Sequence, residues 1–417
     1  MQIFAFIRYQ IRLALNARPL SPYSHCFSHR LPTMTAMNNF TLSEKLRESL
    51  FLEGDIFYYT HARMGLTHIL LTMHKSYPHA KHVIVPAFTC AVVINAIYRA
   101  GLSPVYCDIS PQTLGSCPIS IIRLLEKYSC SALAIIAQHS FGIPCQIDII
   151  SDICKNRNIF LIEDCATTLG SYYKSVYCGN WGDASIFSFD TSKPINCGCG
   201  GILNINNQTL ASHHAIEYQK LKTQSFSDYL YFRLIRFIHS KVYSRSIPPI
   251  GMLCHNLLSL FISRIMNFNG YVDWMNIPPL TSPSSLSSLT VPNKNFYTDL
   301  YMELCSWPEN LRIRRYIYNF FLNDPGIHHS YRWCDNSYVV PLRIVFNCFS
   351  SNSTCISSHF DQNHHWFTPL LQGAISKDLS IYSSLAQSCP VSTYISMYTK
   401  SVVVSPQLKN FLENHSF

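Results

Sequence analysis

The stretch Ile159–Asn206 decides the fold, and it reads IFLIEDCATTLGSYYKSVYCGNWGDASIFSFDTSKPINCGCGGILNIN. Its first apolar run ends in the carboxylate pair Glu163-Asp164. A second apolar run, Ala184–Phe189, is followed by a loop that contains Lys193, and then by glycines and a third short apolar run. An acid at one strand end and a lone lysine after the next strand predict a cofactor that is held at both ends.

The chain before this stretch alternates short apolar runs with helical patterns. Runs without polar alternation, separated by helices of about ten residues, indicate βαβ units and a parallel sheet covered on both faces. Ligands gather at the carboxyl ends of such strands, and four suggestive segments lie there. The predicted strands are His82–Val85, Pro104–Ile109, Ser131–Ala137 and Ile159–Ile162; the segments are Pro86–Cys90, Gln138–Gly142, Glu163–Thr168 and Asp190–Lys193.

Composition narrows the classes of function. The chain of 417 residues is 48% apolar and only 13% charged, and its formal charge of +9 is spread without a run of Lys or Arg. We therefore expect no nucleic-acid partner. The 17 cysteines are odd in number and include no CxxC pair, so they indicate neither a disulfide framework nor a zinc site. We expect reduced cysteines in a cytoplasmic protein, and no bound metal.

Two regions allow a membrane-surface interpretation. No apolar run reaches the roughly 18 residues of a membrane-spanning helix. Residues 1–44 carry arginines among aliphatic residues, which is typical of an amphipathic segment or of a poorly ordered extension, and we expect the latter. Residues 218–264 combine aromatic and basic residues; they predict a helical insertion, with peripheral membrane contact as the alternative.

Lys193 and Asp164 carry the predicted chemistry. A lysine among small residues in a strand-end crevice can form a Schiff base with an aldehyde cofactor, because partial burial helps it to lose its proton. The alternative for Lys193 alone is a surface loop residue. A buried Asp164 would keep the ring nitrogen of pyridoxal phosphate protonated. The alternative for Asp164 is a strand-end residue that caps the following helix.

Other side chains at the same edge are candidates for the phosphate and the ring. Ser188 and the helix start with Arg63 and Met64 are candidate phosphate ligands, because helix N-termini bind anions and arginine adds a bidentate contact. Phe88 could stack on a planar ring or pack in the core. His139 could face the cofactor or be a buried histidine satisfied by the protein.

Four segments together resemble the DegT/StrS family of sugar aminotransferases. They are HVIVPAFTCAVVINAIYRAGLSPVYCDISPQTL, AIIAQHSFGIPCQID, LIEDCATTLGS and GDASIFSFDTSKPINCGCGGIL, in the family's order and spacing over roughly residues 55–205. Beyond them only HHWFTPLL and CPVSTYISMYTKSVVVSP are similar to family landmarks. The resemblance implies an α/β protein of aspartate-aminotransferase fold type I, with a mostly parallel sheet in its large domain. The expected parts are an extension (1–44), a cofactor-binding large domain (45–210), a helical insertion and linker (211–292) and a smaller α+β domain (293–417).

The resemblance also implies a reaction and assigns residues to it. Lys193 falls on the family's Schiff-base lysine, Ser188 on its phosphate-binding serine and Asp164 on its pyridine-nitrogen acid. Arg63 and Met64 fall where the family usually has Thr-Ala in the phosphate loop. The implied activity is a pyridoxal 5'-phosphate-dependent transfer of an amino group, from glutamate or a similar donor, to a keto-sugar carried on a nucleotide. This is amino-sugar and polysaccharide biosynthesis by a homodimer.

Three departures from the family pattern leave alternatives open. Thr167 stands where the family commonly has Gln, and Cys90 stands where a ring-stacking aromatic often follows. No clear partner-loop motif follows the lysine; NFNGY at 267–271 is a distant echo. The alternatives are a catalytically drifted homologue with a regulatory or scaffold role, and a sugar dehydratase. In the family the dehydratase chemistry goes with His in place of the lysine, so Lys193 argues against it. The sequence does not identify the keto-sugar or the amino donor.

Overall fold

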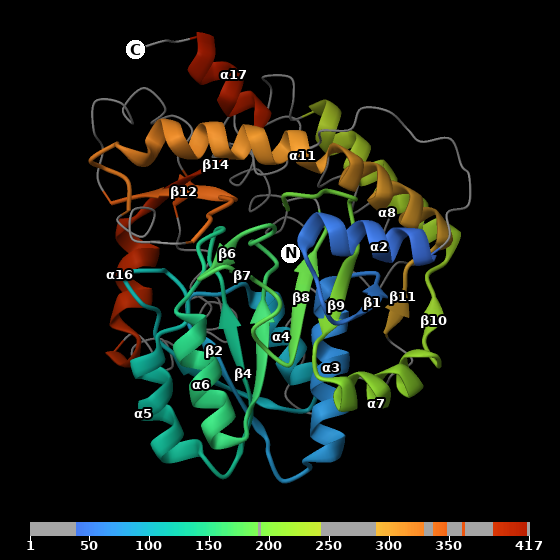
Figure 1. Cartoon of the computed structure of the whole chain (residues 1–417), viewed down its shortest axis with the longest axis vertical. Helices are drawn as coiled ribbons and strands as arrows, with labels where there is room; N and C mark the ends of the chain where they lie inside the picture. The colour runs from blue at the N-terminus through green and yellow to red at the C-terminus, as the bar shows by residue number, and fades with distance from the viewer. Residues whose placement is uncertain are drawn as a thin grey trace, which may run out of the picture.

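The computed structural model of the chain (Figure 1) describes residues 39–190, 193–242, 289–328, 337–347, 361–362 and 387–414. Most of the expected N-terminal extension, the later part of the predicted insertion, and the segments 267–271 and 364–371 lie outside these residues. Within them, helix α2 (Asn39–Leu50) begins near the end of the expected extension. The division into the four expected parts stays a prediction.

A seven-stranded sheet organises the molecule, in the order β1-β9-β8-β5-β4-β2-β3. Neighbouring strands from β3 through to β8 pair in parallel, whereas β9 is antiparallel to both β8 and β1. The predicted α/β class with a mostly parallel sheet is confirmed. The strands are β1 (Asp55–Tyr59), β2 (His82–Pro86), β3 (Ser103–Cys107), β4 (Ala132–Gln138), β5 (Phe160–Asp164), β8 (Ala184–Ser188) and β9 (Gly201–Ile205).

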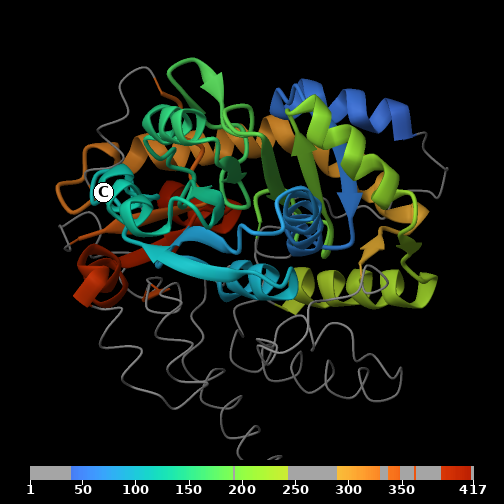
Figure 2. The same cartoon turned by 90° about the horizontal axis from the view of Figure 1, so that it is seen from below.

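Helices cover both faces of this sheet, as Figure 2 shows. One face packs against α3 (Ala62–Ser76), α4 (Ala91–Arg99) and α7 (Gln208–Tyr218). The other face packs against two groups of helices. These are α5 (Pro118–Tyr128) and α6 (Ile147–Arg157) over the middle strands, and α2, α8 (Phe226–Val242) and α11 (Lys294–Leu322) over β1, β8 and β9.

The apolar runs are continuous because both faces of each strand are buried. On β2, Val83 and Val85 pack in the cluster of α3 and α4, whereas Ile84 between them packs in the cluster of α5 and α6. Successive side chains of a strand point to opposite faces, so a strand covered on both sides needs apolar residues at every position. The pattern that predicted a parallel sheet therefore has this physical origin.

A smaller sheet of three strands lies beyond the carboxyl edge of the large one (Figure 1). Its order is β12-β14-β13, from β12 (Arg343–Phe346), β14 (Lys400–Val403) and β13 (Asp361–Gln362), and α16 (Pro390–Tyr398) and α17 (Pro406–Asn414) flank it. Phe88 and Phe141 of the large sheet's loops share one apolar cluster with α11, β12 and β14. The long helix α11 thus connects both parts of the core.

The remaining strands are short pairs. An antiparallel hairpin, β6 (Tyr172–Tyr173) and β7 (Val176–Tyr177), lies between β5 and β8. Strands β10 (Lys222–Thr223) and β11 (Thr290–Val291) pair in parallel at the other side. Among the described helices, none combines the length and the apolar character that crossing a membrane requires.

Candidate functional site

The carboxyl edge of the large sheet brings three predicted site residues into one neighbourhood. Asp164 is the last residue of β5 and Ser188 is the last residue of β8. These strands are parallel neighbours, with Asp164 paired to Ile186, so their ends lie at one edge. Lys193 follows Ser188 by five residues, and its positive charge acts on the carboxyl of Asp164.

Asp164 is a buried carboxyl group with spare hydrogen-bonding capacity. Its side chain is 5% exposed, and its Oδ1 accepts the Ala166 N–H at 3.0 Å. No residue in the described part of the chain is seen to donate to its Oδ2. Burial raises the pKa of Asp164 above its usual value, while the Ala166 N–H and the charge of Lys193 partly oppose this shift. A buried acid with an open oxygen is suited to hold a protonated partner group.

The loop that carries Lys193 is tightly packed where it joins β9. Lys193 is half-buried and donates its N–H to the carbonyl of Asp190 at 3.0 Å. Gly200 adopts a φ of +102°, and a Cβ there would lie 2.2 Å from the ring of Phe296. A Cβ on Gly201 would lie 2.4 Å from the backbone nitrogen of Ala62. These glycines therefore let the end of the lysine loop approach the N-terminus of α3.

Arg63 lies in the first turn of α3 and is 6% exposed. Its Nη2 is 3.8 Å from Oδ2 of Asp190, the first residue of the suggestive segment Asp190–Lys193. Met64 is placed differently, because its N–H donates to the carbonyl of His61 at 2.9 Å and its sulfur accepts from Thr290 at 3.6 Å. Of this pair, Arg63 is the better candidate to bind an anion at this helix start, and that role stays a prediction.

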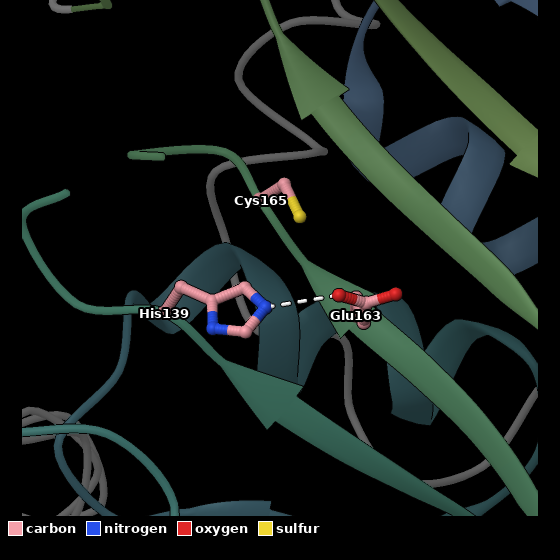
Figure 3. A group of neighbouring side chains, drawn as sticks. All are labelled: His139, Glu163 and Cys165. Atoms are coloured by element: carbon pink, nitrogen blue, oxygen red, sulfur yellow. Dashed lines mark hydrogen bonds and ion pairs between the residues drawn. The ribbon is translucent and has the colours of Figure 1, made fainter. Parts of the chain in front are cut away.

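His139 points into a buried polar cluster with Glu163 and Cys165, as Figure 3 shows. All three are buried, and their candidate ligand atoms lie within 4.8 Å of one another. The backbone N–H of Cys145 donates to His139 Nδ1 at 3.1 Å, so Nδ1 is an acceptor. Nδ1 therefore carries no proton, and the ring proton is on Nε2, which donates to Glu163 Oε2 at 3.1 Å.

This tautomer makes the cluster a poor metal site. A metal ion needs a lone pair on the histidine nitrogen that binds it, and here Nε2 carries the proton. The carboxylate of Glu163 is also occupied, since it accepts the N–H groups of Gly179, Trp181 and Gly182 at 2.7–2.9 Å. We conclude that His139 and Glu163 hold the two strand ends together; a contact of His139 with a cofactor stays a prediction.

The remaining predicted residues lie at the same edge but are engaged elsewhere. Phe88 is 1% exposed and packs edge-on against Phe141, with ring centroids 5.9 Å apart. The hydroxyl of Thr167 donates to the carbonyl of His139 at 2.8 Å and accepts the Phe141 N–H at 3.2 Å. Cys90 is the partly exposed N-cap of α4. Their proposed roles toward a cofactor stay predictions.

Comparison with known proteins confirms the resemblance that the motifs predicted. Residues 60–229 match the DegT/DnrJ/EryC1/StrS aminotransferase family. GDP-perosamine synthase of Escherichia coli O157:H7 is 39% identical over 128 residues, which are 31% of this chain and 34% of that protein. The chain thus matches about a third of the length of its curated relatives.

Solved structures extend the likeness in fold to nearly the whole chain. A DegT/DnrJ/EryC1/StrS aminotransferase from Brucella abortus has a TM-score of 0.60 at 16% identity and covers 98% of this chain and 92% of its own. A Streptococcus pneumoniae protein, solved in PLP and PMP forms, has a TM-score of 0.59 at 15% identity and covers 98% and 94%. The expected aminotransferase fold is therefore confirmed.

Proposed function

We propose that this chain is a pyridoxal 5'-phosphate-dependent aminotransferase that acts on a nucleotide-linked keto-sugar. The amino donor in this proposal is glutamate or a similar amino acid, and the product is an amino sugar for polysaccharide biosynthesis. The observation that carries the proposal is the placement of a buried, open carboxyl group and a loop lysine at one sheet edge, within electrostatic reach of each other. The match of residues 60–229 and the likeness to GDP-perosamine synthase support the choice of substrate class.

The residues present fit this cofactor. Asp164 has a buried carboxylate whose Oδ2 is open to a protonated ring nitrogen. Arg63 places a guanidinium at the start of α3, where a phosphate gains from the helix dipole and from charge-assisted hydrogen bonds. Ser188, 8% exposed at the end of β8, offers a hydroxyl at the same edge. Lys193 offers the amine.

When bound, the cofactor would supply an aldehyde that exchanges amino groups and a ring that stabilises the developing negative charge. Asp164 would hold the proton on the ring nitrogen, and its burial keeps water from competing for that hydrogen bond. Lys193 Nζ would bind the cofactor between turnovers and move a proton at the substrate carbon during them. Arg63 and Ser188 would fix the phosphate, so that the ring is oriented before the substrates arrive.

We further propose that the protein acts as a homodimer in the cytoplasm. The family resemblance implies a site built by two subunits, and twofold homodimers are the commonest oligomers. The twelve cysteines within the described residues are all free, which fits a reducing compartment. Light scattering would contradict the dimer if it gave a fully active monomer. Membrane contact through 218–264 stays a prediction, and only its part up to Val242 is described.

The test uses the full-length protein incubated with pyridoxal phosphate and treated with borohydride. We expect one added cofactor mass on the peptide that contains Lys193, and none in Lys193→Ala. Lys174→Ala is the matched control, because Lys174 is an exposed lysine of the β6–β7 hairpin paired with Asp148. Glutamate should convert the cofactor of the wild-type protein to its amine form. GDP- and dTDP-linked keto-sugars should then restore the aldehyde form.

Each failure has its own meaning. A protein that takes up no cofactor would favour the drifted homologue with a regulatory or scaffold role. A protein that labels on Lys193 but is not converted by any amino acid would contradict the aminotransferase and return the dehydratase to consideration. Conversion by glutamate without any acceptor among the keto-sugars would retain the transaminase and overturn the sugar substrate.

A further inference from the structure

The loop after Lys193 is held from outside the sheet by helix α11. Asn310, on this helix, donates its Nδ2 to the carbonyl of Pro194 at 2.6 Å. Pro194 is buried and Asn310 is 3% exposed, so water does not compete for this hydrogen bond. The two residues are 116 positions apart in the chain. The contact therefore depends on how α11 packs over the large sheet.

Arg314 fixes the orientation of the Asn310 amide. Its Nε donates to Asn310 Oδ1 at 2.7 Å, and its Nη1 donates to the carbonyl of Pro341 at 2.8 Å. A guanidinium can only donate, so it selects the oxygen of the amide and turns the Nδ2 group toward Pro194. Burial lowers the pKa of Arg314 to about 9, and the group is still cationic at neutral pH.

This arrangement pins the backbone on both sides of Lys193. On the N-terminal side of the Lys193 Cα, the Lys193 N–H donates to the carbonyl of Asp190 at 3.0 Å. On the C-terminal side, Pro194 has a fixed φ and no N–H. Its carbonyl is therefore the backbone group of this residue that can accept a hydrogen bond. Asn310 holds that carbonyl. These two hydrogen bonds restrain the backbone from which the Lys193 side chain projects.

We infer that Asn310, oriented by Arg314, is a positioning residue that aims Lys193 at the space beside Asp164. The inference rests on the proposed function, because it gives Lys193 its role. Asn310 reaches no reacting atom and acts through the Pro194 peptide. A second support lies under the same loop, where Glu303 of α11 binds the backbone of Asn196 and the guanidinium of Arg236.

The test compares Asn310→Asp with a matched pair elsewhere in the chain. Asn310→Asp keeps the shape and the contact with Arg314 but replaces the donor to Pro194 with an oxygen. Asn95 of α4 is the control: it is 1% exposed, and its Oδ1 accepts from Arg99 Nε, four residues on, at 2.9 Å. Asn95→Asp therefore makes the same change in the same helical arrangement, away from the lysine loop.

We expect Asn310→Asp to lower kcat by about 10–100-fold, because small displacements of a reacting group have effects of that order. It should also shift the apparent pKa of the Lys193–cofactor linkage, read from a pH titration of the visible absorbance. Asn95→Asp should leave both near wild type while lowering the melting temperature by a similar amount. Arg314→Lys should fall between wild type and Asn310→Asp, since it keeps the charge and loses one of the two donations.

Two outcomes would overturn the inference. The first is an Asn310→Asp protein that folds and labels with borohydride yet keeps the wild-type titration and kcat; Pro194 would then hold its place without Asn310. Equal losses of kcat in Asn310→Asp and Asn95→Asp, with unchanged titrations, would show a structural role only. A wild-type protein that forms no borohydride-stable link to Lys193 would instead contradict the proposed function itself.

Discussion

Two adjacent carboxylates on β5, Glu163 and Asp164, sit in opposite environments. Glu163 accepts four hydrogen bonds, three from backbone N–H groups and one from His139. Asp164, the next residue in the chain, accepts one hydrogen bond, from the Ala166 N–H, and lies near the charge of Lys193. Both are at most 5% exposed. The two carboxylates therefore do not differ in burial, but they differ in the number of hydrogen bonds that the protein donates to them.

The difference shows which of two buried acids is free for chemistry. A carboxylate that is saturated by fixed donors has its charge compensated within the protein and supports the fold. A carboxylate that is buried with an open oxygen bears a raised pKa, and it gains most from a charged partner that arrives later. By this criterion Glu163 stabilises the strand ends, and Asp164 is the candidate for the proposed site.

The largest expected effect comes from Asp164→Asn. Without the carboxylate the ring nitrogen of the cofactor loses its proton-holding partner, and kcat should fall by about 10²–10⁴-fold, the range typical of groups that position protons. Steady-state kinetics with glutamate as donor measure this. If the variant keeps more than half of the wild-type kcat, Asp164 is not the partner of the ring nitrogen. The contrast with Glu163 then says nothing about function.

The same substitution should not destabilise the protein at neutral pH. Burial raises the folded-state pKa of Asp164 above its unfolded value. The stability that this group contributes is thus present below the unfolded pKa and is lost as pH rises through the folded pKa. Cofactor-free Asp164→Asn should accordingly melt at or above the wild-type temperature at pH 7–8, and this advantage should shrink as pH falls. A lower melting temperature at neutral pH would contradict this sign.

Glu163→Gln should show the reverse pattern. The amide keeps one acceptor but turns an NH₂ group toward backbone donors, and breaking such a buried charged network costs about 3 kcal/mol of unfolding free energy. Urea denaturation of the cofactor-free protein measures it. Glu309→Gln is the control, because Glu309 is an exposed partner of Arg312 on α11 and its removal should cost under about 1 kcal/mol. Equal losses in both variants would show that saturation by donors does not mark a structural acid here.

The sequence predicted the sheet well because its signal is local. The non-alternating apolar run at 82–85 lies within β2. The run at 131–137 overlaps all but one residue of β4. Strand β12 (Arg343–Phe346) occupies only the last four residues of the largely apolar run 338–346.

The sequence could predict which candidate residues lie at this sheet edge, but not which of them are held by hydrogen bonds within the protein. The sequence placed Glu163 and Asp164 at a strand end, yet it could not show which was saturated, because Gly179, Trp181 and Gly182 lie beyond a hairpin. His139 was open to two interpretations until its Nδ1 was seen to accept from Cys145. The sequence around Asn310 did not predict its contact with Pro194, because the two residues are 116 positions apart in the chain.

The smallest expected effect tests the same rule at a third acid, Asp108. Its carboxylate accepts the N–H groups of Ile109, Val391 and Ser392 and the hydroxyl of Ser392, at 2.6–2.9 Å. Val391 and Ser392 belong to the first turn of α16, so a residue after β3 caps a helix 284 positions later. A carboxylate at a helix start satisfies orphan N–H groups and complements the helix dipole.

Asp108→Ala should therefore cost about 1–2 kcal/mol of unfolding free energy and speed hydrogen exchange in residues 390–398, with kcat little changed. Ser392→Ala removes one of the four donors and should have a smaller effect in the same direction. Because Asp108 is as saturated as Glu163, the rule assigns it to structure although it lies on the same side of the molecule as the site. A large loss of kcat without faster exchange in α16 would place Asp108 with Asp164 instead, and the count of donors would then fail to separate the two kinds of acid.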